Sequence, residues 1–203
     1  MSGTWVVFEG GDGVGKTTQI ERLAAWFGER VPHAGLTEIV VTREPGGTDL
    51  GVKLRAAVMH GDHVAPRAEA LLYAADRAHH IHALVRPALE RGAVVLQDRY
   101  LDSSIVYQGG ARGLGDEVER ISLWATEGLL PNLTVVLDMA PDATRLGREL
   151  DRVERETAEH AALIREGFLA LAARAPQRYA VIDGARSVDE VFADVVTAVE
   201  RIL

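Results

Sequence analysis

Residues 10–17 read GGDGVGKT and match the phosphate-binding pattern G-x-x-x-x-G-K-[ST] at every specified position. The apolar run at 4–9 directly precedes them and is typical of a buried strand. Downstream, Ile20, Leu23 and Phe27 recur at the spacing of an amphipathic helix with one face on a core. Strand, glycine loop and helix therefore follow one another in the order that a phosphate-binding loop requires.

This loop predicts a site for an oligophosphate. Glycines let successive backbone N–H groups point into one concavity, and the helix that follows adds the positive end of its dipole. We expect Lys16 to reach the β- and γ-phosphates and the Thr17 hydroxyl to hold Mg²⁺. The residues predicted to bind ATP are Gly10, Gly11, Asp12, Gly13, Val14, Gly15, Lys16, Thr17 and Thr18. The alternative is a glycine turn followed by an ordinary surface lysine, and the strand–helix context disfavours it.

Length and composition limit the class of protein. The 203 residues suit one domain, and 47% of them are apolar. No apolar run approaches the ~20 residues of a membrane span, so we expect a soluble protein with no membrane partner. A nucleotide-dependent reaction would place it in the cytoplasm. The absence of cysteine excludes disulfides and thiolate metal sites. A net charge of −8 has the wrong sign for wrapping nucleic acid, so local arginines must bind any anionic substrate.

Apolar runs and helical patterns alternate along the chain. We predict strands at 4–9, 38–41, 94–96, 134–138 and 179–182. Helical patterns separate them, and Pro87 predicts a kink or a new start within the long Ala/Leu-rich stretch 67–91. This alternation predicts an α/β domain over 1–203, with about five parallel strands covered by helices on both faces.

A phosphate loop alone leaves GTPase switches, motor ATPases and small-molecule kinases open. The sequence has no Asn-Lys-x-Asp guanine reader and no suitably placed D-x-x-G switch. It does have Arg43, Arg55, Arg77 and Arg99 at predicted strand ends or on neighbouring helices. A guanidinium group can donate two parallel hydrogen bonds to phosphate or carbonyl oxygens. This set of arginines therefore favours a kinase that acts on a phosphorylated acceptor.

Five further motifs carry a resemblance to a known family. They are Phe8-Glu9-Gly10, TREPGGT at 42–48, LLYAADR at 71–77, DRY at 98–100, and the stretch from Ser103-Ser104 to YQGG at 107–110. With them the chain resembles the bacterial thymidylate kinases along nearly its whole length. The resemblance implies a P-loop NTPase of the nucleoside monophosphate kinase type, a homodimer, and Mg²⁺-dependent transfer of phosphate from ATP to dTMP for dTTP synthesis.

The resemblance also assigns residues to the thymine base. Tyr73 occupies a position where the family usually has a phenylalanine that stacks on thymine. Arg77, four residues on, would present its guanidinium to a base carbonyl. Ser104 and Gln108, also four residues apart, would read the pyrimidine edge. A solvated helix arginine and ordinary helix packing are the alternatives.

Other positions match residues that hold the acceptor nucleotide. Arg99 and Arg55 resemble the residues that bind the monophosphate, with surface salt bridges as the alternative. Tyr100 resembles the aromatic residue that crowds the ribose 2′ position, with core packing as the alternative. Glu9 and Glu44 would contact the substrate or support the residues that do, with a purely structural role as the alternative.

The predicted catalytic residues lie in the loop, at the end of the third strand and in a lid at about 145–156. They are Lys16, Arg99, Asp12, Arg148 and Arg152, with Thr17 and Asp98 as metal ligands. Gly13 stands where another subtype of the family has an arginine, so the lid arginines are expected to supply that charge. The alternative for the lid is a surface helix with oppositely charged side chains three or four residues apart.

Some alternatives remain open. A different nucleoside monophosphate kinase or a deoxynucleoside kinase would keep the loop and change the acceptor, whereas a nucleotide-binding switch would bind ATP without turnover. His79, His80 and His82 lack a nearby acidic or cysteine ligand, so we expect surface histidines and not a metal site.

Overall fold

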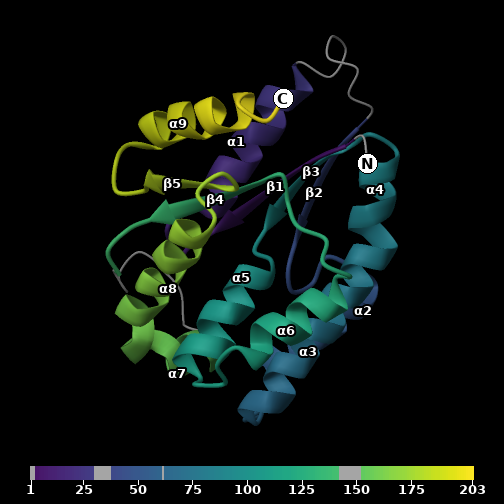
Figure 1. Cartoon of the computed structure of the whole chain (residues 1–203), viewed down its shortest axis with the longest axis vertical. Coiled ribbons are helices and arrows are strands. Elements are labelled where there is room, and N and C mark those ends of the chain that lie inside the picture. The colour runs from purple at the N-terminus through teal and green to yellow at the C-terminus, as the bar shows by residue number, and fades with distance from the viewer. Residues whose placement is uncertain (1–2, 30–37, 61, 142–151) are drawn as a thin grey trace.

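The computed structural model describes residues 3–29, 38–60, 62–141 and 152–203. Its centre is a five-stranded parallel sheet with the strand order β2-β3-β1-β4-β5 (Figure 1). The strands are β1 (Thr4–Glu9), β2 (Ile39–Arg43), β3 (Val94–Asp98), β4 (Leu133–Asp138) and β5 (Tyr179–Asp183). The predicted parallel sheet is confirmed, and each strand lies within two residues of its predicted bounds.

Helices cover both faces of this sheet. They are α1 (Lys16–Gly28), α2 (Asp49–His60), α3 (Pro66–His80), α4 (Arg86–Glu90), α5 (Leu101–Ser104), α6 (Glu117–Ala125), α7 (Arg152–Thr157), α8 (Ala161–Arg174) and α9 (Val188–Glu200). Two π-helical segments, η1 (Ile81–Val85) and η2 (Ile105–Ala111), and the short 3₁₀ helix η4 (Ala158–His160) complete the helical elements of the described residues.

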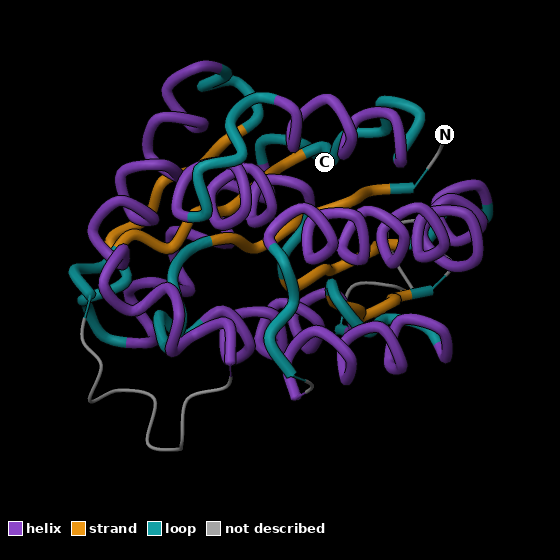
Figure 2. Tube along the Cα trace, turned by 90° about the horizontal axis from the view of Figure 1, so that it is seen from below, coloured by secondary structure: helices purple, strands orange, loops and turns teal. Residues whose placement is uncertain are grey.

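Alternate residues of β1 divide the core into two layers. Val6 and Phe8 face α1 and α9, while Trp5 and Val7 face η1 and α4. Figure 1 shows α1 and α9 on one side of the sheet with α3, α6 and α8 on the other, and Figure 2 shows the strands enclosed between helices. The central strand is therefore buried on both faces, as its continuous apolar run predicts.

The long helical stretch from Pro66 to Glu90 changes its hydrogen bonding near Pro87. The π-helical segment η1 lies between α3 and α4 and ends immediately before Arg86. Proline has no backbone N–H to donate, and a π turn is one way for a helix to accommodate the missing bond. The predicted break at Pro87 thus takes the form of a local change in helix type.

The carboxyl ends of β1, β2 and β3 lie side by side. In the register of the sheet, Phe8 pairs with Asp98, and Asp98 pairs with Arg43. The backbone N–H of Arg99 continues this pairing by donating to the Phe8 carbonyl at 2.9 Å. Residues that follow these strands therefore gather at one edge, where ligands of open α/β sheets bind.

Candidate active site

The phosphate loop connects β1 to α1 with glycines in the left-handed region. Gly13 and Gly15 have φ angles of 74° and 92°. Gly10 has a φ of 131°, and a Cβ there would lie 2.6 Å from the Leu137 carbonyl oxygen. Only glycine fits at Gly10 without a shift of the backbone. The first turn of α1 has no side-chain cap, so its N–H groups remain available to an anion.

Lys16 is buried beneath this loop. Its Nζ donates to the carbonyl oxygens of Gly10 at 3.2 Å and Gly11 at 2.6 Å. Burial, followed by the nearby positive charge of Arg99, lowers the pKa of Lys16 to about 8. A phosphate bound at the loop would favour the charged ammonium and could take over its hydrogen bonds.

Arg99 follows β3 with a φ of 66°, which is unusual for a residue other than glycine. Its Nη1 donates to the Gly10 carbonyl at 3.1 Å and to Ser103 Oγ at 2.9 Å, and its Nη2 donates to Asp12 Oδ1 at 2.5 Å. Burial opposes the charge, but Tyr107 and Asp12 raise the pKa of Arg99 well above its usual value. The strained backbone and these bonds hold a permanent cation beside the phosphate loop.

Asp12 is the acidic partner of that cation. Tyr107 donates its hydroxyl to Asp12 Oδ2 at 3.1 Å. Burial raises the pKa of Asp12, but the charges of Arg99 and Lys16 outweigh this effect and hold it below its usual value. Asp12 is therefore ionised at neutral pH.

Glu9 supports Arg99 from inside the protein. It is fully buried, and its Oε1 accepts from the backbone N–H groups of Tyr100 at 2.8 Å and Ser103 at 3.1 Å. Its Oε2 accepts from Ser103 Oγ at 2.6 Å. Burial, followed by the negative charge of Asp102, raises the pKa of Glu9 to about 7. Glu9 thus fixes the turn between β3 and α5 that carries Arg99.

Asp98 and Thr17 fit a divalent cation. Thr17 Oγ1 lies 3.5 Å from Asp98 Oδ2, and Asp98 Oδ1 is buried with no hydrogen-bond partner among the described residues. The described part of the chain has no group of three acidic or histidine side chains that could hold a metal alone. Mg²⁺ is bound in proteins by one or two side chains together with substrate phosphates, and the Thr17 hydroxyl and the unpartnered Asp98 oxygen match that donor set.

One cavity of about 420 Å³ joins the loop to the predicted substrate residues. The predicted residues that line it are Asp12, Gly13, Gly15, Lys16, Thr17, Glu44, Arg55, Tyr73, Arg77, Asp98, Arg99, Tyr100, Ser104 and Gln108. The remaining loop residues Gly10, Gly11, Val14 and Thr18 are not part of its lining. The structure therefore brings together residues from positions 12 to 108.

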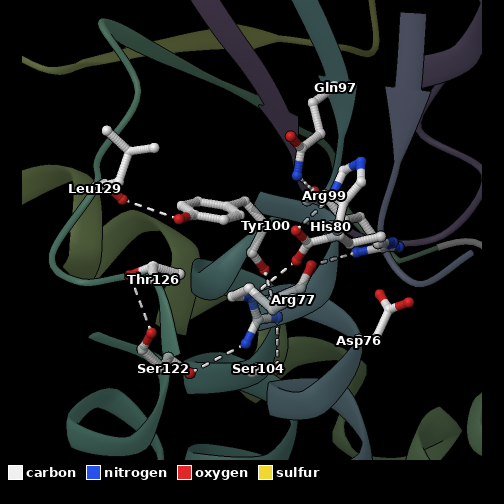
Figure 3. Close-up of polar contacts among 12 residues, drawn as sticks. Asp76, Arg77, His80, Gln97, Arg99, Tyr100, Ser104, Ser122, Thr126 and Leu129 are labelled. Carbon is white, nitrogen blue, oxygen red and sulfur yellow. Dashed lines mark hydrogen bonds and ion pairs between the residues drawn. The ribbon is translucent and has the colours of Figure 1, made fainter. Parts of the chain in front are cut away.

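Arg77 is buried and makes more hydrogen bonds within the protein than the sequence predicts (Figure 3). Its side chain is 2% exposed, and Nε donates to Glu44 at 2.8 Å. Nη1 donates to Ser122 Oγ at 3.2 Å, and Nη2 donates to Ser104 Oγ at 3.0 Å and to the Tyr100 carbonyl at 3.3 Å. Four of its five N–H groups are thus engaged. One N–H remains for the predicted contact with a base carbonyl.

His80 corrects the prediction of surface histidines. It is fully buried, with Nδ1 2.8 Å from Glu44 Oε1 and Nε2 2.7 Å from Thr42 Oγ1. A carboxylate can only accept, so Nδ1 donates to Glu44. His80 is three positions after Arg77, and this helical spacing is the one sequence signal for their shared buried face. His82, in contrast, is exposed.

Asp76 belongs to the same buried group and was not predicted from sequence. Burial, followed by the charge of Glu44, raises its pKa to about 6. Its Oδ1 accepts a long bond of 3.4 Å from the Gly46 N–H, and Oδ2 is buried without a partner in the described chain.

The ring of Tyr100 has a structural role beside its place in the cavity wall. It lies edge-on to Trp5 at 4.7 Å between ring centroids, and its hydroxyl donates to the Leu129 carbonyl at 2.9 Å.

The lid predictions fall largely outside the described residues. Arg148 is not described, and only the end of the predicted lid at 145–156 belongs to α7. Arg152, in α7, is buried and donates to the Val58 carbonyl at 2.8 Å and to Glu69 Oε2 at 2.6 Å. Its guanidinium is thus held at Glu69, while the next two residues of α7, Val153 and Glu154, line the cavity.

The parallel sheet, the phosphate loop and the cavity that also contains arginines define the class of P-loop nucleotide kinases. A model of the thymidylate kinase family matches residues 8–195. The chain belongs to the thymidylate kinase family, and the resemblance seen in the motifs is confirmed. No helix among the described residues has the length and apolar character needed to cross a membrane.

Individual relatives agree with this assignment. A thymidylate kinase of Clavibacter michiganensis is 51% identical, with 100% of this chain and 97% of that protein covered. A thymidylate kinase of Leifsonia xyli is 55% identical over 95% of this chain and 92% of its own. The crystal structure of thymidylate kinase from Ehrlichia chaffeensis is 26% identical, with a TM-score of 0.79, and covers 98% of this chain and 99% of that one.

Proposed function

We propose that this protein transfers the γ-phosphoryl group of ATP to the 5′-phosphate of dTMP, giving dTDP and ADP. One observation carries this proposal: a single cavity is lined both by Lys16 and Thr17 of the phosphate loop and by Arg77 and Gln108 of the predicted base pocket. A nucleotide switch does not require these base-pocket residues in the same cavity as the phosphate loop. The product would enter dTTP synthesis for DNA replication.

Catalysis in this site would rest on positioning and on neutralisation of charge. The attacking group is a phosphate oxygen that is already ionised, so no general base is required. Lys16 would move its hydrogen bonds from the loop carbonyls to the transferred phosphate. Arg99 stands between the loop and the acceptor pocket and would bring the two phosphates together against their repulsion. Arg148 stays a predicted lid contributor.

Mg²⁺ would be held by Thr17 and by Asp98, whose unpartnered Oδ1 supports the assignment. When bound, it would neutralise negative charge on the phosphate oxygens of ATP.

The acceptor would occupy the pocket beside α3. Tyr73 would stack on the base, while Ser104 and Gln108 would contact its polar edge. Arg55, whose Nη1 donates to the Pro45 carbonyl at 3.1 Å, would bind the monophosphate with Arg99. The predicted role of Tyr100, exclusion of a ribose 2′-hydroxyl, is compatible with its position in the cavity wall.

The test is ADP release from Mg-ATP with dTMP, dUMP, dCMP, AMP, GMP and thymidine offered separately. Turnover with dTMP well above the others supports the proposal. Preference for another monophosphate would support the kinase assignment but contradict thymine as the base. Preference for thymidine would make the protein a nucleoside kinase. Binding of ATP without any turnover would favour the switch.

We also propose a homodimer in the cytoplasm, with residues 1–203 as one domain and the segment at about 145–156 as its lid. The support is the family membership and the cytoplasmic supply of ATP and dTMP. Light scattering tests the dimer, and cell fractionation tests the location.

A further inference from the structure

Glu69 is a fully buried carboxylate in the first turn of α3. Its Oε1 accepts from Gln108 Nε2 at 2.9 Å and from Arg112 Nε at 3.3 Å. Its Oε2 accepts from Arg112 Nη2 at 3.3 Å and from Arg152 Nη2 at 2.6 Å. One side chain therefore joins α3, η2, the residue after η2, and α7.

Two arginines make this buried charge tolerable and fix its orientation. A carboxylate buried without partners would be strongly destabilising, and here both oxygens are matched by guanidinium donors. Arg112 contacts both oxygens, and Arg152 contacts the second. Glu69 is thus held as a rigid acceptor toward Gln108.

This acceptor determines which way the Gln108 amide points. A carboxylate cannot donate, so the amide nitrogen of Gln108 must face Glu69. The amide oxygen then points away from Glu69. Gln108 is 2% exposed, it lines the cavity, and its Oε1 has no hydrogen-bond partner within the described ranges. The pocket therefore presents Gln108 Oε1 as a hydrogen-bond acceptor. Glu69 prevents the opposite orientation of the Gln108 amide.

We propose that Glu69 is a positioning residue for base selection: it holds Gln108 as an acceptor for the N3–H of a 2,4-dioxopyrimidine and thereby excludes cytosine. Thymine and uracil carry a hydrogen on N3, whereas cytosine presents a lone pair there. Two acceptors facing each other in a buried pocket leave both without a donor, which a polar site rejects strongly. This inference rests on the proposed acceptor pocket and deepens it.

The first variant is Glu69→Gln, which keeps the shape and can donate to Gln108. The Gln108 amide can then turn and offer its NH₂ to N3 of cytosine. We expect the ratio of kcat/KM for dTMP over dCMP to fall by about ten- to hundredfold, mainly through KM. The ratio for dTMP over dUMP should stay unchanged, because both bases carry N3–H, and KM for ATP should stay unchanged as well.

Two further variants separate positioning from stability. Glu69→Asp keeps a negative charge beside Arg112 and Arg152 but draws the carboxylate back from Gln108, so it should also lose discrimination even if Glu69→Gln does not fold. Glu119→Gln is the matched control, since Glu119 pairs with Arg174 at the surface. It should leave every ratio unchanged.

Action through Gln108 is tested by combining variants. Gln108→Leu should itself lose the discrimination, and adding Glu69→Gln should change the ratio no further. Folded Glu69 variants that retain the wild-type preference for dTMP over dCMP would overturn the proposal, as would fully additive effects.

Calorimetric binding of dTMP and dCMP, measured beside turnover, distinguishes this inference from the proposed function. If the wild type binds dTMP selectively but transfers no phosphate, the kinase fails while the loss of binding selectivity in Glu69→Gln still supports the positioning role. If the wild type binds dTMP no better than dCMP, the positioning role is wrong whatever the turnover.

Discussion

Arg99 Nη2 lies 2.5 Å from Asp12 Oδ1, and this ion pair ties the end of β3 to the phosphate loop. The same guanidinium also donates to Gly10 and Ser103, so a single planar group spans three partners. This one cation therefore lies between the phosphate loop and the residues that follow β3, and both line the same cavity.

Replacement of Arg99 by lysine should lower kcat by about 10²–10³-fold. A lysine keeps the charge but has no planar fork, so it cannot contact Asp12, Gly10 and Ser103 together. Steady-state kinetics with dTMP and ATP give the effect, and thermal unfolding should change little. Arg91→Lys, at an exposed arginine paired with Glu38, is the control. Near-normal kcat in Arg99→Lys would mean that the ion pair serves only the fold.

The lowered pKa of Lys16 predicts how activity depends on pH. In the free enzyme this pKa is about 8, so Lys16 loses its charge as the pH rises above that value. Binding of ATP needs the charged form, and kcat/KM for ATP should therefore fall about tenfold per pH unit above about pH 8. Bound phosphates favour the charged ammonium, so kcat at saturating ATP should decline only at higher pH. If kcat/KM for ATP and kcat declined over the same pH range, this interpretation would be wrong.

Lys16→Ala should lower kcat by about 10²-fold or more while dTMP binding stays largely intact. The reason is that Lys16 belongs to the donor half of the cavity and contacts the loop carbonyls. Turnover assays and calorimetry with dTMP separate the two effects. Lys53 is the one other lysine in the sequence and is exposed, which makes Lys53→Ala a matched control. Normal turnover in Lys16→Ala would remove this loop from the reaction.

Arg77→Ala should lower the free energy of unfolding by about 3–5 kcal/mol, because it leaves the buried carboxylate of Glu44 without one of its partners. Urea titrations measure this loss. The double variant Arg77→Met with Glu44→Gln should recover part of it, since both charges are then absent. A small loss in the single variant would show that Arg77 acts on the substrate alone, as the sequence suggested.

Gly47→Ala tests the buried chain from Thr42 through His80 to Glu44. A Cβ at Gly47 would lie 2.4 Å from His80 Nε2 and 2.6 Å from Thr42 Oγ1, so these side chains must separate. We expect a loss of about 1–3 kcal/mol in the free energy of unfolding.

Gly28→Ala supplies the comparison for Gly47→Ala. A Cβ at Gly28 meets nothing within 4 Å at the end of α1. It should stabilise the protein by up to about 1 kcal/mol, because alanine favours the helix. Equal effects of both variants in urea titrations would show that the Thr42–His80 contact is dispensable.

Local patterns determined much of this protein from sequence alone. The glycine spacing at 10–17 predicted the loop, because the backbone conformation that requires glycine is set by residues only a few positions away. The alternation of apolar runs and helical periods predicted the parallel sheet, since burial on both faces leaves a local signature. The predicted parallel topology also places the carboxyl ends of β2 and β3 at one edge, as the structure confirms.

Only the tertiary structure decided how the polar side chains pair. Glu69 meets Gln108 and Arg152 from 39 and 83 residues away, and Arg77 meets Ser122 from 45. Such pairs depend on the packing of separate helices, and nothing in the neighbouring sequence records them. The sequence by itself thus determined the phosphate loop and the sheet that carries it. The buried carboxylates and arginines that shape the acceptor pocket were decided by the fold, because a buried charge is stable only where distant partners surround it.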